Sequence, residues 1–103
     1  MHHAMLAHGK AVREFRAAGS PGEIGLVVDV WKRYPATDSA EDRNLAQQEE
    51  DDSFRFFFDE VFDKGPRAST LERYAAQGTP LDIRDGDAQI VGAPMDFLGL
   101  NVY

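Results

Sequence analysis

The chain has 103 residues, enough for one small domain, and its 43% hydrophobic and 28% charged residues are typical of a soluble globular protein. A net charge of −7 argues against nucleic acid or an anionic membrane as the main partner, and the absence of cysteine excludes disulfides and thiolate metal sites. We expect a cytoplasmic protein, because the sequence shows neither a signal peptide nor an apolar run long enough to span a membrane.

Residues 2–17 are predicted to form a helix, because Met5, Val12 and Phe15 recur near one face at helical spacing. Gly19 is suited to cap its C-terminus, since glycine adopts the left-handed conformation that often ends a helix. The sequence therefore begins with an amphipathic helix and a turn.

The next segment, IGLVVDV (residues 24–30), is a continuous apolar run with one acidic residue near its end. Half-exposed strands alternate apolar and polar residues, whereas strands of a parallel sheet are covered on both faces. The run therefore predicts a parallel strand that is buried on both faces.

A single long helix is predicted over residues 40–62. Ser39 is its expected N-cap, with Asp42 three residues later in the capping-box position. The acidic run EEDD (residues 49–52) is interpreted as a solvated helix face. The second half of the helix carries an apolar stripe that is expected to pack against a core, formed by Phe54, Phe57, Phe58, Val61 and Phe62.

A weaker helix over residues 69–77 and one helical turn before Gly92 precede a final strand, residues 96–102. Two strands of buried type joined by helices imply a parallel pair with a right-handed crossover. Because two parallel strands leave both edges unpaired, residues 1–103 are predicted to be one segment of a larger α/β domain.

Four stretches in this order resemble glycoside hydrolase family 1, the β-glucosidase family, whose fold is a (β/α)8 barrel. They are HHAMLAHGKAVREFR, GEIGLVVDVWKRYPATDSAEDRNLA, FRFFFDEVFDKG and GDAQIVGAPMDFLGLNVY. The resemblance covers essentially all 103 residues and implies a fragment from the helix after the fourth barrel strand through the sixth strand. The expected fold is α/β: a partial (β/α)8 TIM barrel with two parallel strands and flanking helices.

The resemblance implies a retaining hydrolase of β-glycosides that needs no cofactor or metal. Such enzymes use two carboxylates about 5–5.5 Å apart, one as acid/base and one as nucleophile. The family carries them in N-E-P and E-N-G motifs, and neither tripeptide occurs here. The chain is therefore expected to contain no catalytic residue and to be inactive alone, although the intact parent would be a glycosidase acting on β-glycoside substrates.

The resemblance also implies two pocket residues. Asn101 and Tyr103 match positions that lie in the family's sugar pocket, where the Tyr hydrogen-bonds the nucleophile and the Asn joins the surrounding polar network. Asp29 and Trp31 depart from the family, which usually has Asn and a small or polar residue there. Both lie at the carboxyl end of a strand, the side on which barrel enzymes keep their sites. Trp31 is a candidate for stacking on the leaving-group sugar.

Other candidate features favour ordinary structural roles. His2, His3 and His8 lack the spacing of metal ligands, so no metal site is expected. The alternative to an enzyme segment is a small α/β interaction module without catalytic activity, which would self-associate through its exposed sheet edges and the apolar stripe.

Overall fold

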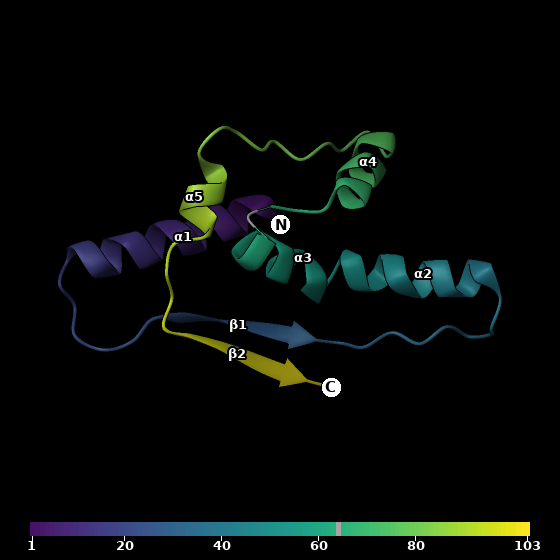
Figure 1. The fold of residues 1–103 in the computed structure, drawn as a ribbon, viewed down its shortest axis with the longest axis horizontal. Helices are drawn as coiled ribbons and strands as arrows, with labels where there is room; N and C mark the ends of the chain where they lie inside the picture. Colours follow the sequence, from purple (N-terminus) through teal and green to yellow (C-terminus); the bar gives the residue numbers. More distant parts are fainter. Residues whose placement is uncertain (64) are drawn as a thin grey trace.

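The computed structural model describes residues 1–63 and 65–103. Its elements in chain order are α1 (His2–Ala17), β1 (Gly25–Val30), α2 (Ala40–Asp51), α3 (Phe54–Phe58), the π-helical turn η1 (Asp59–Asp63), α4 (Ala68–Ala76), α5 (Asp87–Val91) and β2 (Phe97–Val102) (Figure 1). In the part of the chain so described, no helix has the length and apolar character needed to cross a membrane.

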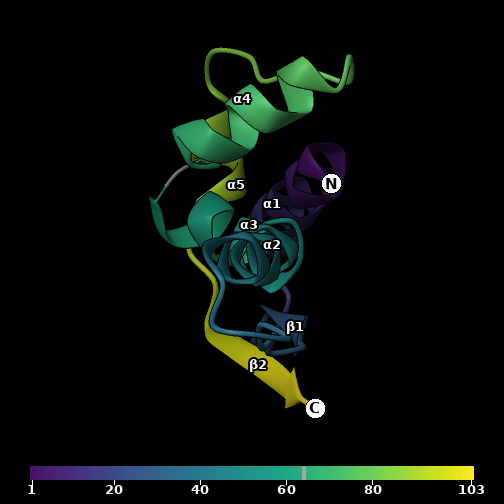
Figure 2. The same cartoon turned by 90° about the vertical axis from the view of Figure 1, so that its right-hand side faces the viewer.

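Strands β1 and β2 pair in parallel, which confirms the prediction from the sequence. The register runs from Gly25 opposite Phe97 to Val30 opposite Val102. The helices lie on one side of this pair, and the other face of the sheet is uncovered (Figure 2). Val28 is therefore buried while its neighbour Val27 is exposed. The prediction of a strand buried on both faces is wrong for these residues, because none of the described elements covers the second face.

The predicted helix over residues 40–62 begins as expected, since the Ser39 hydroxyl accepts the Asp42 N–H at 3.1 Å. It does not continue to residue 62, however, because Ser53 leaves helical geometry at φ −112°, ψ −114°. Both the Ser53 N–H and its hydroxyl donate to the Glu50 carbonyl, at 3.2 and 3.1 Å. A serine hydroxyl that competes for a helix carbonyl in this way favours a turn.

The break and the π-helical turn η1 change which aromatic side chains face the core. Phe56, which lies outside the predicted apolar stripe, is fully buried, whereas Phe62 of that stripe is 59% exposed. Phe62 leaves the predicted stripe because the π-helical turn shifts its residues around the helix axis. The prediction that the whole stripe packs inward is therefore wrong.

The core lies between α1, α3 and α5, where Met5, Phe56 and Val91 pack together. Gly9 allows the helices α1 and α5 to approach closely, because a Cβ at this position would overlap the Ile90 carbonyl. The contact therefore joins two helices backbone to backbone.

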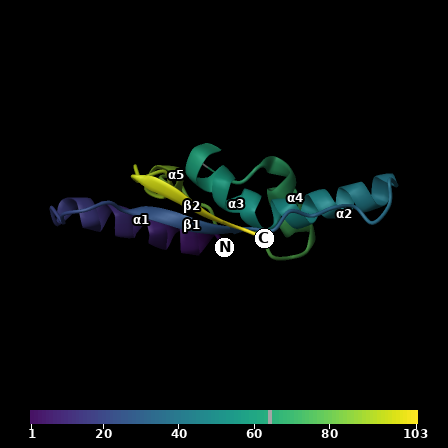
Figure 3. The ribbon, with the colours of Figure 1, turned by 90° about the horizontal axis from the view of Figure 1, so that it is seen from below.

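The described residues form a flat slab of 53 × 31 × 17 Å (Figure 3). Their radius of gyration is 15.6 Å, compared with about 13 Å for a closed domain of this length. Their accessible surface is 6666 Å², whereas a closed monomer of 11.5 kDa exposes about 5800 Å². The fold thus leaves surface uncovered that a complete domain of this size would bury.

A buried histidine joins three elements at the far side of the core from the sheet. His2 Nδ1 lies 2.6 Å from Glu60 Oε1, and His2 Nε2 lies 3.0 Å from Asp87 Oδ2. A neutral imidazole has one N–H, so both contacts are hydrogen bonds donated by the ring only when it is protonated. Burial lowers the pKa of His2, but the bonds to Asp87 and Glu60 outweigh burial and raise it overall.

We expect His2→Gln to remove a pH-dependent part of the stability. Because the folded-state pKa of His2 is raised, its contribution is complete below the unfolded value of 6.5 and is lost as the pH rises through the folded value. The difference in free energy of unfolding between the wild type and H2Q, measured by urea unfolding, should therefore shrink as the pH rises above 6.5. The exposed His3 provides the control, H3Q, which should keep the wild-type pH dependence. A difference that stays constant with pH would contradict the prediction.

Candidate functional site

The carboxyl ends of β1 and β2 meet at one edge of the sheet because the strands are parallel. The register places Asp29 directly opposite Asn101, and Asn101 Nδ2 donates a hydrogen bond of 2.9 Å to Asp29 Oδ1. Both side chains are exposed. Two of the residues predicted from the sequence are thus brought into direct contact, although they lie 72 residues apart.

The other two predicted residues, Trp31 and Tyr103, form a stacked aromatic pair one step beyond the strands. Their ring centroids lie 4.5 Å apart with an interplanar angle of 18°. The Tyr103 N–H donates to the Val30 carbonyl at 3.2 Å, which continues the parallel ladder past the end of β2. The side chains remain accessible, with Trp31 47% and Tyr103 68% exposed. The structure therefore places all four predicted residues together at the carboxyl ends of the two strands, a region called the strand edge below.

An open cavity of about 500 Å³ adjoins this edge; residues of both faces of β1 line it, and α3 bounds it on one side. Asp29, Trp31 and Asn101 contribute to its wall, and Phe54 and Phe57 line it from the helical side. Its volume falls within the ~300–1,000 Å³ common for small-molecule sites. Its wall combines aromatic surface with a few polar groups, which is the lining typical of small-molecule sites.

The arrangement is suited to binding and orientation. Asn101 offers an amide oxygen as acceptor, and the second oxygen of Asp29 can accept from a hydroxyl group. The contact that fixes Asp29 is to an amide, whereas glycoside hydrolysis by retention needs a pair of carboxylates. Among the residues that the structure describes, no group of His, Cys, Asp and Glu side chains is arranged to hold a metal ion.

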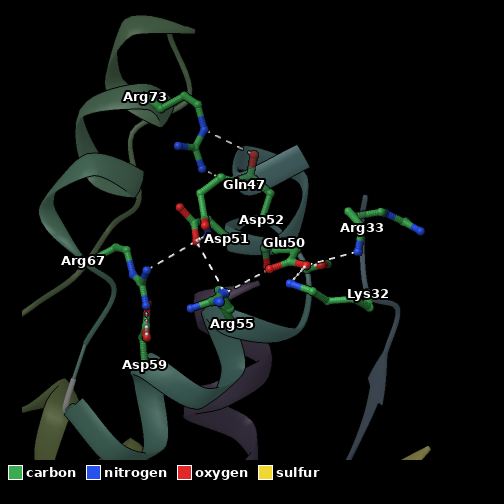
Figure 4. A network of polar contacts seen from close by, with 11 residues as sticks. Lys32, Arg33, Gln47, Glu50, Asp51, Asp52, Arg55, Asp59, Arg67 and Arg73 are labelled. Atoms are coloured by element: carbon green, nitrogen blue, oxygen red, sulfur yellow. Dashed lines mark hydrogen bonds and ion pairs between the residues drawn. The ribbon is translucent and has the colours of Figure 1, made fainter. Parts of the chain in front are cut away.

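The acidic run at residues 49–52 lies in an ion-pair network next to the loop after β1 (Figure 4). Its interpretation as a solvated face holds for Glu49, which is exposed, but is wrong for the two residues that follow. Glu50 and Asp51 are buried. They are neutralised by cationic side chains from the loop after β1, from α3 and from the segment before α4: Lys32, Arg55 and Arg67. The last residue of the run, Asp52, pairs with Arg73 of α4. The run therefore joins four segments of the chain.

Sequence reasoning did not identify Glu50, Glu60 or Asp87 as important. Their partners lie far away in the chain: Lys32 for Glu50, and His2 for the other two carboxylates, 58 and 85 residues distant. No local spacing signals such contacts. For His2 the predicted structural role agrees with its burial.

The chain is similar to known proteins over its whole length. The chain matches the family model for glycosyl hydrolase family 1 over residues 1–103. Beta-glucosidase A of Acetivibrio thermocellus is 30% identical over 102 residues, and a 6-phospho-beta-galactosidase of Clostridium acetobutylicum is 35% identical over 111 residues. These matches cover 99% and 100% of this chain but 23% of each relative, so the chain spans less than a quarter of their length.

The fold agrees with the same relationship. The crystal structure of a family 1 β-glucosidase from Exiguobacterium antarcticum B7 matches with a TM-score of 0.88 and 29% identity, covering 99% of this chain and 23% of that one. The parallel strands and flanking helices thus form a partial (β/α)8 barrel, as expected from the sequence. A family match across the whole chain, and a backbone that follows a solved member throughout, confirm the resemblance: the chain belongs to glycosyl hydrolase family 1.

Proposed function

We propose that these residues form a segment of a retaining hydrolase of β-glucosides or related β-glycosides. The observation that carries the proposal is the convergence of Asp29, Trp31, Asn101 and Tyr103 at the carboxyl ends of two adjacent parallel strands. In (β/α)8 barrels this is the end at which active sites lie. The names of the relatives, a β-glucosidase and a 6-phospho-β-galactosidase, support a β-glycoside as the substrate class.

Each residue of the edge has a role in this proposal. The Tyr103 hydroxyl, which has no hydrogen-bond partner within residues 1–63 and 65–103, donates to the nucleophile carboxylate of the complete site. Asn101 lies in the polar network around the sugar, with its amide oriented by Asp29. Trp31 offers an aromatic face to the leaving-group sugar, since the apolar C–H surface of a sugar ring gains by covering it.

The catalytic carboxylates of the proposed site come from outside these 103 residues. The sequence contains neither N-E-P nor E-N-G, the motifs in which the family carries them. Asp29 has an amide partner, and the buried Glu50 is paired with cations. The segment would therefore bind and orient substrate without breaking the glycosidic bond.

The purified 103-residue chain is expected to show no hydrolysis of an aryl β-glucoside, because it lacks the carboxylate pair that the reaction requires. Release of the aryl alcohol, measured by absorbance beside a complete family 1 β-glucosidase as positive control, tests this. Hydrolysis that persists through repeated purification would contradict the proposal that the catalytic carboxylates lie outside these 103 residues. The flanking DNA provides a second check, since we expect N-E-P to be encoded upstream and E-N-G downstream.

In a complete barrel that contains these residues, Tyr103→Phe should lower kcat/KM for the aryl β-glucoside by roughly 10- to 100-fold. The change removes one hydrogen bond to a charged group, worth about 1.5–3 kcal/mol, and keeps the ring that stacks on Trp31. Val102→Ile is the matched control, because it changes the neighbouring side chain without removing a hydrogen-bonding group. Equal kcat/KM for Y103F and the wild type would exclude the proposed contact.

A second candidate function is self-association as an interaction module. Apolar side chains on and beside the sheet are exposed, notably Leu100 and Val102, and both outer strand edges are unpaired in the described residues. Such edges pair readily with another copy.

If the chain self-associates, its mass by multi-angle light scattering should rise with concentration toward that of a dimer or larger assembly. Val102→Lys should reduce this rise, because a charged side chain on an exposed strand disfavours pairing. The matched control places the same charge on α1, at the exposed position Ala11. A monomeric mass at high concentration would count against this function.

A further inference from the structure

We propose that Glu50 is a positioning residue for the strand edge: its buried carboxylate fixes the backbone just beyond Trp31 and so holds the indole ring against Tyr103. Its effect on substrate binding rests on the proposed function, whereas the positioning of Trp31 does not. Glu50 lies in the last turn of α2, so it reaches the edge from another element of the fold.

The contacts of Glu50 converge on the segment that follows β1. Its Oε1 accepts the backbone N–H of Arg33 at 3.1 Å and lies 2.6 Å from Lys32 Nζ. Its Oε2 accepts from Arg55 Nε at 3.3 Å (Figure 4). The carboxylate thus holds the two residues directly after Trp31, one by its backbone and one by its side chain.

Burial makes these contacts strong and hard to replace. Glu50 is 2% exposed, so its carboxylate has little access to water as an alternative partner. Burial alone would raise the pKa of Glu50, but the bonds from Lys32, the Arg33 N–H and Arg55 outweigh it and lower the pKa. The group is therefore ionised at neutral pH, and its hydrogen bonds are charge-assisted.

Trp31 lies between this fixed point and a second one. On its N-terminal side, the parallel ladder holds Val30, whose carbonyl accepts the Tyr103 N–H, and the Asn101 side chain bonds Asp29. On its C-terminal side, Glu50 holds Arg33. Two rings as exposed as Trp31 and Tyr103 make a weak stack unless the backbone on both sides is fixed.

A ring held in this way is oriented before a ligand arrives, so binding does not have to order it. A functional side chain at the end of a strand needs support of this kind from neighbouring residues to keep its geometry. Glu50 would therefore influence ligand affinity without touching the ligand.

Trp31 is the one tryptophan in the sequence, so the environment of its ring can be measured directly. In the 103-residue chain we expect Glu50→Ala to weaken the near-UV circular dichroism of the Trp31–Tyr103 pair to about the level of Tyr103→Ala, and to make Trp31 fluorescence more easily quenched by acrylamide. Glu49→Ala is the matched control. Glu49 is adjacent and exposed, and within the described residues its carboxylate makes one polar contact, a 4.0 Å ion pair with the Arg33 side chain, so E49A should retain both wild-type signals.

A wild-type near-UV band in E50A, with the far-UV helical signal intact, overturns the proposal. If E50A does not fold, Arg33→Pro provides the test. This variant removes the backbone N–H that donates to Glu50 and leaves Glu50 paired with Lys32 and Arg55. A weakened band in folded R33P supports the proposal, and an unchanged band overturns it. Since neither readout requires turnover, these outcomes are independent of the activity tests on Tyr103.

Discussion

The parallel ladder between β1 and β2 is the constraint on which the candidate site depends. A parallel register fixes both the face and the level of every residue, so Asp29 meets Asn101, and Trp31 comes level with Tyr103. A shift by one residue would turn these side chains to the opposite face, toward the helices. The helices then determine which face stays open. They cover the side of Val28 and leave the side of Val27 uncovered.

Features with a local physical cause could be predicted from the sequence. The Ser39 cap, the two apolar strands and the close of α1 near Gly19 depend on neighbours within a few residues. The four residues of the strand edge were found through family resemblance. The parallel pairing explains why they meet.

Long-range partners explain what the sequence did not reveal. The burial of Glu50 depends on Lys32, which lies on the other side of a loop, and the burial of Glu60 depends on His2. When its partners are unknown, an acidic side chain is predicted to be exposed to solvent, because burying an isolated charge is costly. The break at Ser53 was missed for a related reason: a serine is acceptable in a helix until its hydroxyl takes the Glu50 carbonyl.

The separation of the two strands in the chain also affects how the protein forms. Asp29 and its partner Asn101 are 72 residues apart, so at ~5–20 residues per second of synthesis β1 is made about 4–14 s before β2. During that interval α3, which packs on β1, can shield one side of the strand, while the edge that β2 will occupy is unpaired. Glu50 follows Arg33 by 17 residues, so their contact can form before β2 is made. The nascent chain can thus fix the segment beyond β1 first and add the second strand to a prepared edge.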